Sequence, residues 1–152
     1  MQTVNIDPFH IIGLSVRTIN GDERAEQDIG GLWQRFMGEG VMAKIPNKVS
    51  PEICAIYTNY EGDHTQPYDM ILGCKVASLE DVPEGMIGQT FTGGNYAPFQ
   101  AKGKLSDGVV VAAWHSIWKS DLDRTYSADL EIYGEKAQNP DDAEVDIFIA
   151  VS

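Results

Sequence analysis

The sequence is poor in residues that build metal centres or covalent active sites. It has two cysteines and three histidines in 152 residues. His10, His64 and His115 are not spaced as metal ligands usually are. A phosphate-binding Gly-Lys-Ser/Thr loop, a dinucleotide-binding glycine pattern and a nucleophile elbow around Ser15 or Ser116 are all missing from the sequence. We therefore expect no metal and no cofactor.

Basic residues are also scarce. Eleven Lys and Arg face 23 Asp and Glu, which gives a formal net charge of -12. Such a charge repels the phosphate backbone, so we expect no direct binding to nucleic acid. The acidic surface favours cationic partners, or it only keeps the protein dispersed in solution.

Long hydrophobic runs are missing as well. The sequence lacks a charged segment followed by an apolar one at its start, and no apolar run approaches the roughly 18 residues of a membrane span. We therefore expect a cytoplasmic protein without a membrane partner. Cys54 and Cys74 lie in separate apolar runs, which suits reduced thiols in the core. If those runs pair as a hairpin, the two could face one another and form a disulfide.

What the sequence does contain is one order of segments that occurs twice. In the first copy, about residues 1–80, we predict a strand at 9–18, a helix carrying Ile29, Leu32, Trp33 and Phe36, and strands at 53–60 and 68–76. In the second copy, about residues 86–152, we predict a strand at 89–96, a helix at 106–121, and strands at 128–133 and 145–151. The whole chain, 1–152, then forms a single α+β domain. Two pseudo-two-fold strand-helix-strand-strand modules share an antiparallel sheet with two main helices and a central ligand cleft.

Two details of the first predicted helix can be tested. Asn20 or Asp22 is a suitable cap for its start. Gly30 and Gly31 weaken its middle by roughly 1 kcal/mol each relative to alanine. We expect that these glycines let the helix approach the sheet or a ligand closely, and we favour simple close packing.

Glu131 is the most informative single residue. On a strand, Asp129, Glu131 and Tyr133 point to one face and Leu130 and Ile132 to the other. A carboxylate on a half-buried strand is costly unless a positive or hydrogen-bonding group meets it. Glu131 is therefore the predicted anchor of a cationic guest, although the solvent face of an edge strand is the other open placement.

Aromatic side chains provide the predicted walls of the cleft. Their faces attract cations, while a carboxylate below supplies the opposite charge. The candidates are Trp33, Phe36, Tyr57, Tyr60, Tyr96, Trp114 and Trp118. Taken singly, Trp33, Phe36 and Trp114, which lie at helical spacing, are more typical of the hydrophobic core than of a binding site.

Several segments, taken in order, resemble a known family. They are residues 11–18, Leu32-Trp33 with Phe36, residues 45–48, 57–61 and 71–73, the spacing of Trp114 and Trp118, and residues 129–133. Together they resemble the GyrI-like, AraC-type effector-binding domains, and among these the stand-alone integron-associated effector-binding proteins. The resemblance implies a cleft between two modules and a buried glutamate on a late strand, which Glu131 matches.

The resemblance implies a binding protein for cationic amphipathic or aromatic small molecules. It leaves two alternatives open. One is a hydrolase in which Glu131, aided by Tyr133, is a general base. The other is a partner protein that regulates transcription or a DNA-processing enzyme, because the sequence shows no DNA-binding module. A homodimer is left open too.

Overall fold

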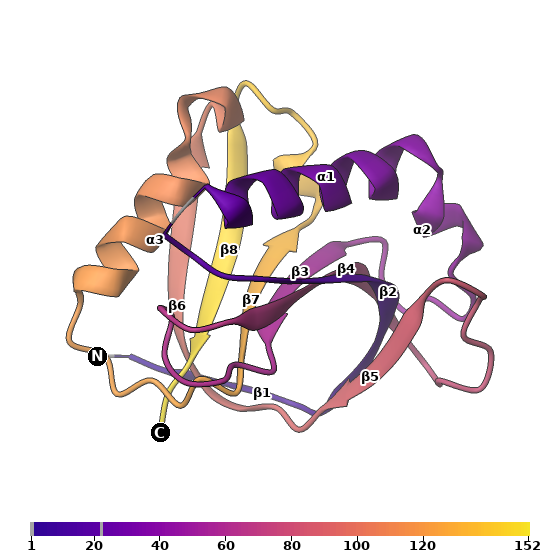
Figure 1. Ribbon diagram of the computed structural model, residues 1–152, viewed down its shortest axis with the longest axis horizontal. Coiled ribbons are helices and arrows are strands. Elements are labelled where there is room, and N and C mark those ends of the chain that lie inside the picture. The colour runs from indigo at the N-terminus through magenta and orange to yellow at the C-terminus, as the bar shows by residue number, and fades with distance from the viewer. Residues whose placement is uncertain (1, 22) are drawn as a thin grey trace.

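The computed structural model describes residues 2–21 and 23–152. Within these residues the chain forms one antiparallel sheet of eight strands and three α-helices (Figure 1). The strands are β1 (Val4–Ile6), β2 (Phe9–Thr18), β3 (Ile53–Thr58), β4 (Tyr68–Val76), β5 (Ile87–Phe91), β6 (Gly94–Gly103), β7 (Ala128–Tyr133) and β8 (Ala143–Ala150). The helices are α1 (Arg24–Gly38), α2 (Val41–Lys44) and α3 (Val109–Lys119). In the part of the chain that is described, none of them is long and apolar enough to cross a membrane.

The strand order displays the internal symmetry. It runs β1-β6-β8-β7-β3-β4-β2-β5. The inner strands form two equivalent triplets, β6-β8-β7 and β3-β4-β2, which meet where β7 pairs with β3. This arrangement confirms the predicted α+β fold with pseudo-two-fold modules.

The two outer strands are exchanged between the modules. β1 pairs with β6 of the second module, whereas β5 pairs with β2 of the first. The predicted strand at 89–96 is therefore wrong. Gly93 has a φ of 74°, and a Cβ there would lie 2.1 Å from the Ile6 carbonyl oxygen, so the chain turns between β5 and β6 at a position that requires glycine.

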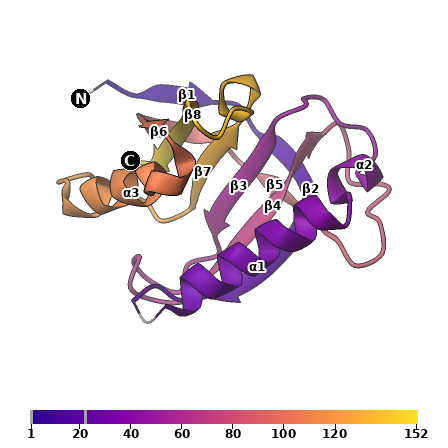
Figure 2. The same ribbon diagram turned by 90° about the horizontal axis from the view of Figure 1, so that it is seen from above.

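The two long helices cover the same face of the sheet. In Figure 2, α1 and α3 lie on either side of β3 and β7. The buried residues of α1 are Leu32 and Phe36, and those of α3 are Trp114 and Ile117. Each helix has its own core cluster beneath it, and a third cluster fills the opposite, curled face of the sheet.

The helix starts differ from the prediction. α1 begins at Arg24 after Glu23, and the side chain of Asn20 bonds the β3–β4 loop instead of capping it. The other cap candidate, Asp22, lies outside the described residues. α3 begins at Val109 after Gly108 and not at residue 106, because a short 3-10 helix occupies Leu105–Asp107.

The two cysteines are buried and free. Cys54 pairs across the sheet with Gly73, so Cys54 and Cys74 point to opposite faces of neighbouring strands. The conceivable disulfide is thus ruled out by the register. Burial raises the pKa of Cys54 to about 12, which keeps this thiol protonated and unreactive.

Candidate ligand-binding site

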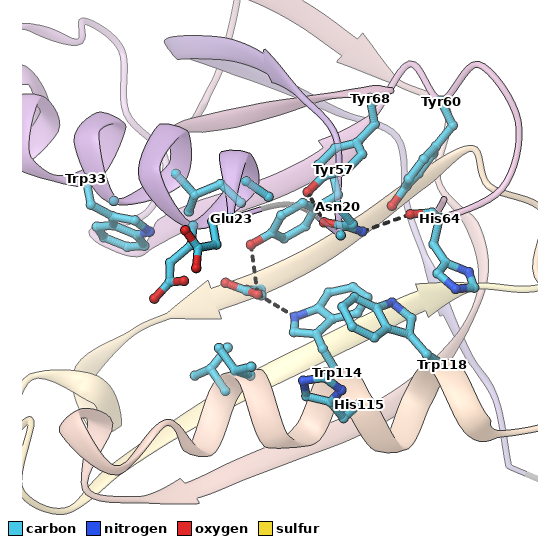
Figure 3. Close-up of a pocket in the computed structure, with 18 of the residues that line it drawn as sticks. Asn20, Glu23, Trp33, Tyr57, Tyr60, His64, Tyr68, Trp114, His115 and Trp118 are labelled. Atoms are coloured by element: carbon cyan, nitrogen blue, oxygen red, sulfur yellow. Dashed lines mark hydrogen bonds between the residues drawn. The ribbon is translucent and has the colours of Figure 1, made fainter. Parts of the chain in front are cut away.

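A cavity of about 610 Å³ lies between α1 and α3 above the central strands (Figure 3). Tyr57 of β3 and Glu131 of β7 form part of its floor, where the two modules meet. Five residues of α1 line it: Ala25, Glu26, Ile29, Gly30 and Trp33. Five residues of α3 also line it: Val110, Val111, Trp114, His115 and Trp118. The cavity therefore has one wall from each module.

Glu131 is buried in this floor, with a relative exposure of 2%. Its Oε2 accepts hydrogen bonds from the Trp114 indole N–H at 2.6 Å and the Tyr57 hydroxyl at 3.0 Å. Its Oε1 accepts one from the Tyr133 hydroxyl at 2.6 Å. All three donors are neutral, so they fix the carboxylate in place without cancelling its charge.

The surroundings of Glu131 work against its ionisation. Burial raises the pKa of Glu131 above its ordinary value, although the hydrogen bonds from Tyr133, Trp114 and Tyr57 oppose that rise. Burial and the nearby Glu131 also raise the pKa of Tyr57 and Tyr133 well above their ordinary values. The tyrosines therefore stay protonated as donors, and a cation beside Glu131 would favour the carboxylate form.

A second buried acid on β7 has a different environment. Asp129 is fully buried, and its Oδ2 forms an ion pair of 2.8 Å with Arg124, whose side chain is only 6% exposed. Asp129 also accepts hydrogen bonds from the Tyr60 hydroxyl and the Ala150 amide. Arg124 thus compensates the charge of Asp129, whereas the three hydrogen-bond donors of Glu131 carry no charge.

Aromatic rings surround the carboxylate. The Trp114 ring lies 5.3 Å from that of Tyr57 at 67°, and the Trp33 ring lies 4.8 Å from that of Tyr133 at 75°. Trp118 closes the far end of the cavity, where the His64 ring stacks on it at 5.5 Å (Figure 3). The edge-to-face contacts of Trp33 and Trp114, and the stacking of His64 on Trp118, hold these rings in fixed orientations.

The loop that carries His64 is anchored from several sides. Asn20 donates a hydrogen bond to the His64 carbonyl and accepts one from the Tyr68 hydroxyl (Figure 3). Arg17, in turn, contacts the Asn59 carbonyl and the carboxylate of Glu61. The wall at this end of the cavity is therefore built into the fold.

The structure brings most of the predicted binding residues together. The lining includes Trp33, Tyr57, Tyr60, Trp114, Trp118 and Glu131; their role in binding stays a prediction. Phe36 and Tyr96 do not line the cavity. Phe36 lies in the core beneath α1, and Tyr96 belongs to the cluster on the opposite face of the sheet.

Sequence reasoning missed several lining residues. They are Glu23 and Glu26 at the start of α1, Tyr68, His64, His115 and Arg124. Tyr68 could have been found, because strand alternation places it on the same face as Met70. His64 and Arg124 lie in loops, where no periodic signal exists.

The hydrolase alternative pairs Glu131 with Tyr133, and the two side chains are in direct contact. A raised pKa suits a general base. Catalysis by this pair stays a prediction.

Comparison with known proteins finds relatives in both structure and sequence. The integron cassette protein VCH_CASS2 of Vibrio cholerae is 29% identical, with a TM-score of 0.77 over 99% of this chain and 95% of that one. SAV2435, solved with tetraphenylphosphonium bound, is 18% identical and has the same fold, with a TM-score of 0.77 over 99% of this chain and 93% of that one. Bacillus subtilis YobU, named as a transcriptional regulator, is 27% identical across 97% of this chain and 94% of its own length.

The family model of the Cass2 integron-associated effector binding proteins matches residues 2–151. Its match covers both modules and every described residue that lines the cavity. The chain therefore belongs to the Cass2 family of integron-associated effector binding proteins, within the GyrI-like superfamily.

Proposed function

We propose that this protein binds cationic, partly aromatic small molecules in the cleft between its modules, with Glu131 as the counter-ion. The observation that carries the proposal is a carboxylate buried to 2% exposure whose three hydrogen-bond donors are all neutral. A cation that enters the cleft meets an oriented negative charge in a medium of low dielectric, where attraction is stronger than in water.

The walls support the same ligand class. Trp33, Trp114 and Trp118 all line the cavity, and aromatic faces attract cations by roughly 0.5 to 2 kcal/mol each. The cavity volume of about 610 Å³ lies within the usual range for small-molecule sites. The tetraphenylphosphonium held by SAV2435, a protein of the same fold, is a cation of this kind.

The charge preference can be tested with two ions of one shape. We expect the protein to bind tetraphenylphosphonium at least about a hundredfold more tightly than tetraphenylborate, because only the sign of the charge differs beside Glu131. Quenching of the three tryptophans that line the cavity, or calorimetry, measures both affinities. Equal affinities for the two ions would show that the cleft binds by hydrophobicity alone, and they would contradict the role of Glu131 as counter-ion.

The affinity for tetraphenylphosphonium should also fall as the solution is made acidic. Protons compete with the cation for Glu131, and because burial raises the pKa of this carboxyl, the fall begins above the pH at which an exposed glutamate titrates. Below that pKa, each pH unit should cost about a factor of ten in affinity. Titrations between neutral and acidic pH measure the slope.

Two histidines in the lining need a control. His64 and His115 would also repel a cation when protonated. Replacing both with glutamine should leave the Glu131-dependent slope in place. A parent profile that is flat, or a slope that disappears with the histidines, would contradict the assignment to Glu131.

A further inference from the structure

Gly30 has no structural requirement that explains it. It lies in the middle of α1, where glycine is a poor helix former. A Cβ placed there meets no atom within 4 Å, and its φ lies outside the range that favours glycine. The close packing expected for Gly30 is therefore wrong, and the same measurement shows open space beside Gly31.

The two glycines face different hollows. Gly30 lines the ligand cavity together with Glu26 and Trp33, which lie four residues before it and three after it on the same helical face. Gly31 borders a separate shallow groove beside Val16 and Arg35. Of the two glycines, only Gly30 therefore affects the volume of the cleft.

We propose that Gly30 determines the size of the ligand. Because it has no side chain, it leaves space in the cavity beside the backbone of α1, and one ring of a bulky, multi-ring cation lies in that space. From Glu26 to Trp33 the helix rises by about 10 Å, and the missing side chain lies between them. The inference rests on the proposed function and extends it from charge to shape. The preferred ligand is then a cation whose charge is surrounded by two or more rings, since a small ammonium ion beside Glu131 would leave the space beside Gly30 empty.

The test compares Gly30→Leu with Gly31→Leu, using tetraphenylphosphonium and the one-ring cation phenyltrimethylammonium as probes. Gly30→Leu should weaken tetraphenylphosphonium binding by about ten- to hundredfold, because the new side chain occupies the space of a ring. It should change phenyltrimethylammonium affinity by less than about threefold. Gly31→Leu, with the same change in helix propensity, should leave both affinities at the parental level.

Gly30→Ala is a second control, because a single methyl group raises the helix propensity of this position while filling only a small part of the space beside it. It should raise the unfolding temperature and weaken tetraphenylphosphonium binding by less than Gly30→Leu does. Parental tetraphenylphosphonium affinity in Gly30→Leu, or equal losses for both probes, would overturn the role of Gly30 while leaving cation binding intact. A parent that binds neither probe would instead overturn the proposed function, and this inference with it.

Discussion

Glu131→Gln will bind tetraphenylphosphonium at least about thirtyfold more weakly than the parent, which corresponds to a loss of about 2 kcal/mol or more. The substitution keeps the size of the side chain and a carbonyl oxygen that can take the place of Oε2 and accept from Trp114 and Tyr57, but it removes the charge. The bound cation then lacks the buried counter-ion in the floor of the cavity. Fluorescence titration or calorimetry on both proteins gives the ratio.

The ligand-free variant should be no less stable than the parent at neutral pH. The folded-state pKa of Glu131 is raised above its ordinary value, so ionisation of Glu131 opposes folding. The stability of the parent therefore falls as the pH rises from the ordinary pKa of a glutamate through the folded-state pKa of Glu131. Glutamine avoids this cost. Tyr133→Phe is the matched control, because it removes one hydrogen bond to Glu131 and keeps the charge. Equal affinities in Glu131→Gln and the parent would refute the counter-ion role.

Arg124→Met will destabilise the protein by about 3 to 5 kcal/mol. The substitution leaves the Asp129 carboxylate buried with the Tyr60 hydroxyl and the Ala150 amide but without its cation. The size of the loss follows from burial: Arg124 and Asp129 are 6% and 0% exposed at their side chains. Chemical denaturation measures the change in the free energy of unfolding.

An exposed arginine is the control for this pair. Arg17 also contacts two acids, Glu61 and Asp69, but its side chain is 43% exposed. Solvent screens such pairs, so Arg17→Met should cost far less. The double variant Arg124→Met, Asp129→Asn should recover part of the stability, because it leaves no buried unpaired charge. Similar losses for the two arginines would show that burial does not set the cost.

The placement of Glu131 could be predicted from the sequence because two signals agree. Strand alternation groups Glu131 with Tyr133, and the family resemblance places a glutamate on this late strand. The partner of each acid could not be predicted. Arg124 reaches Asp129 from the loop before β7, and no pattern in the sequence distinguishes that pairing from one with Glu131.

The wrong placements of Tyr96 and Phe36 have separate causes. The sequence predicts one strand at 89–96, but β5 ends at Phe91, and after the turn at Gly93 Tyr96 lies in β6 and faces the side of the sheet opposite the cavity. Phe36 shares the stripe of Leu32, which faces the core, whereas Trp33 lies about 100° around the helix and faces the cavity. Hydrophobicity alone does not separate these two faces, and a glycine such as Gly30 gives no signal for either.

The exchange of outer strands limits how this chain can be divided. A cut between residues 80 and 86 would separate β2 from β5 and β1 from β6, so each fragment would expose the backbone groups of an unpaired edge. The two halves have similar topologies, yet neither half contains all the strands that complete its own part of the sheet. Separated fragments should therefore reassociate or aggregate. We also expect insertions at this junction to be tolerated only while both outer strands can still reach their partners.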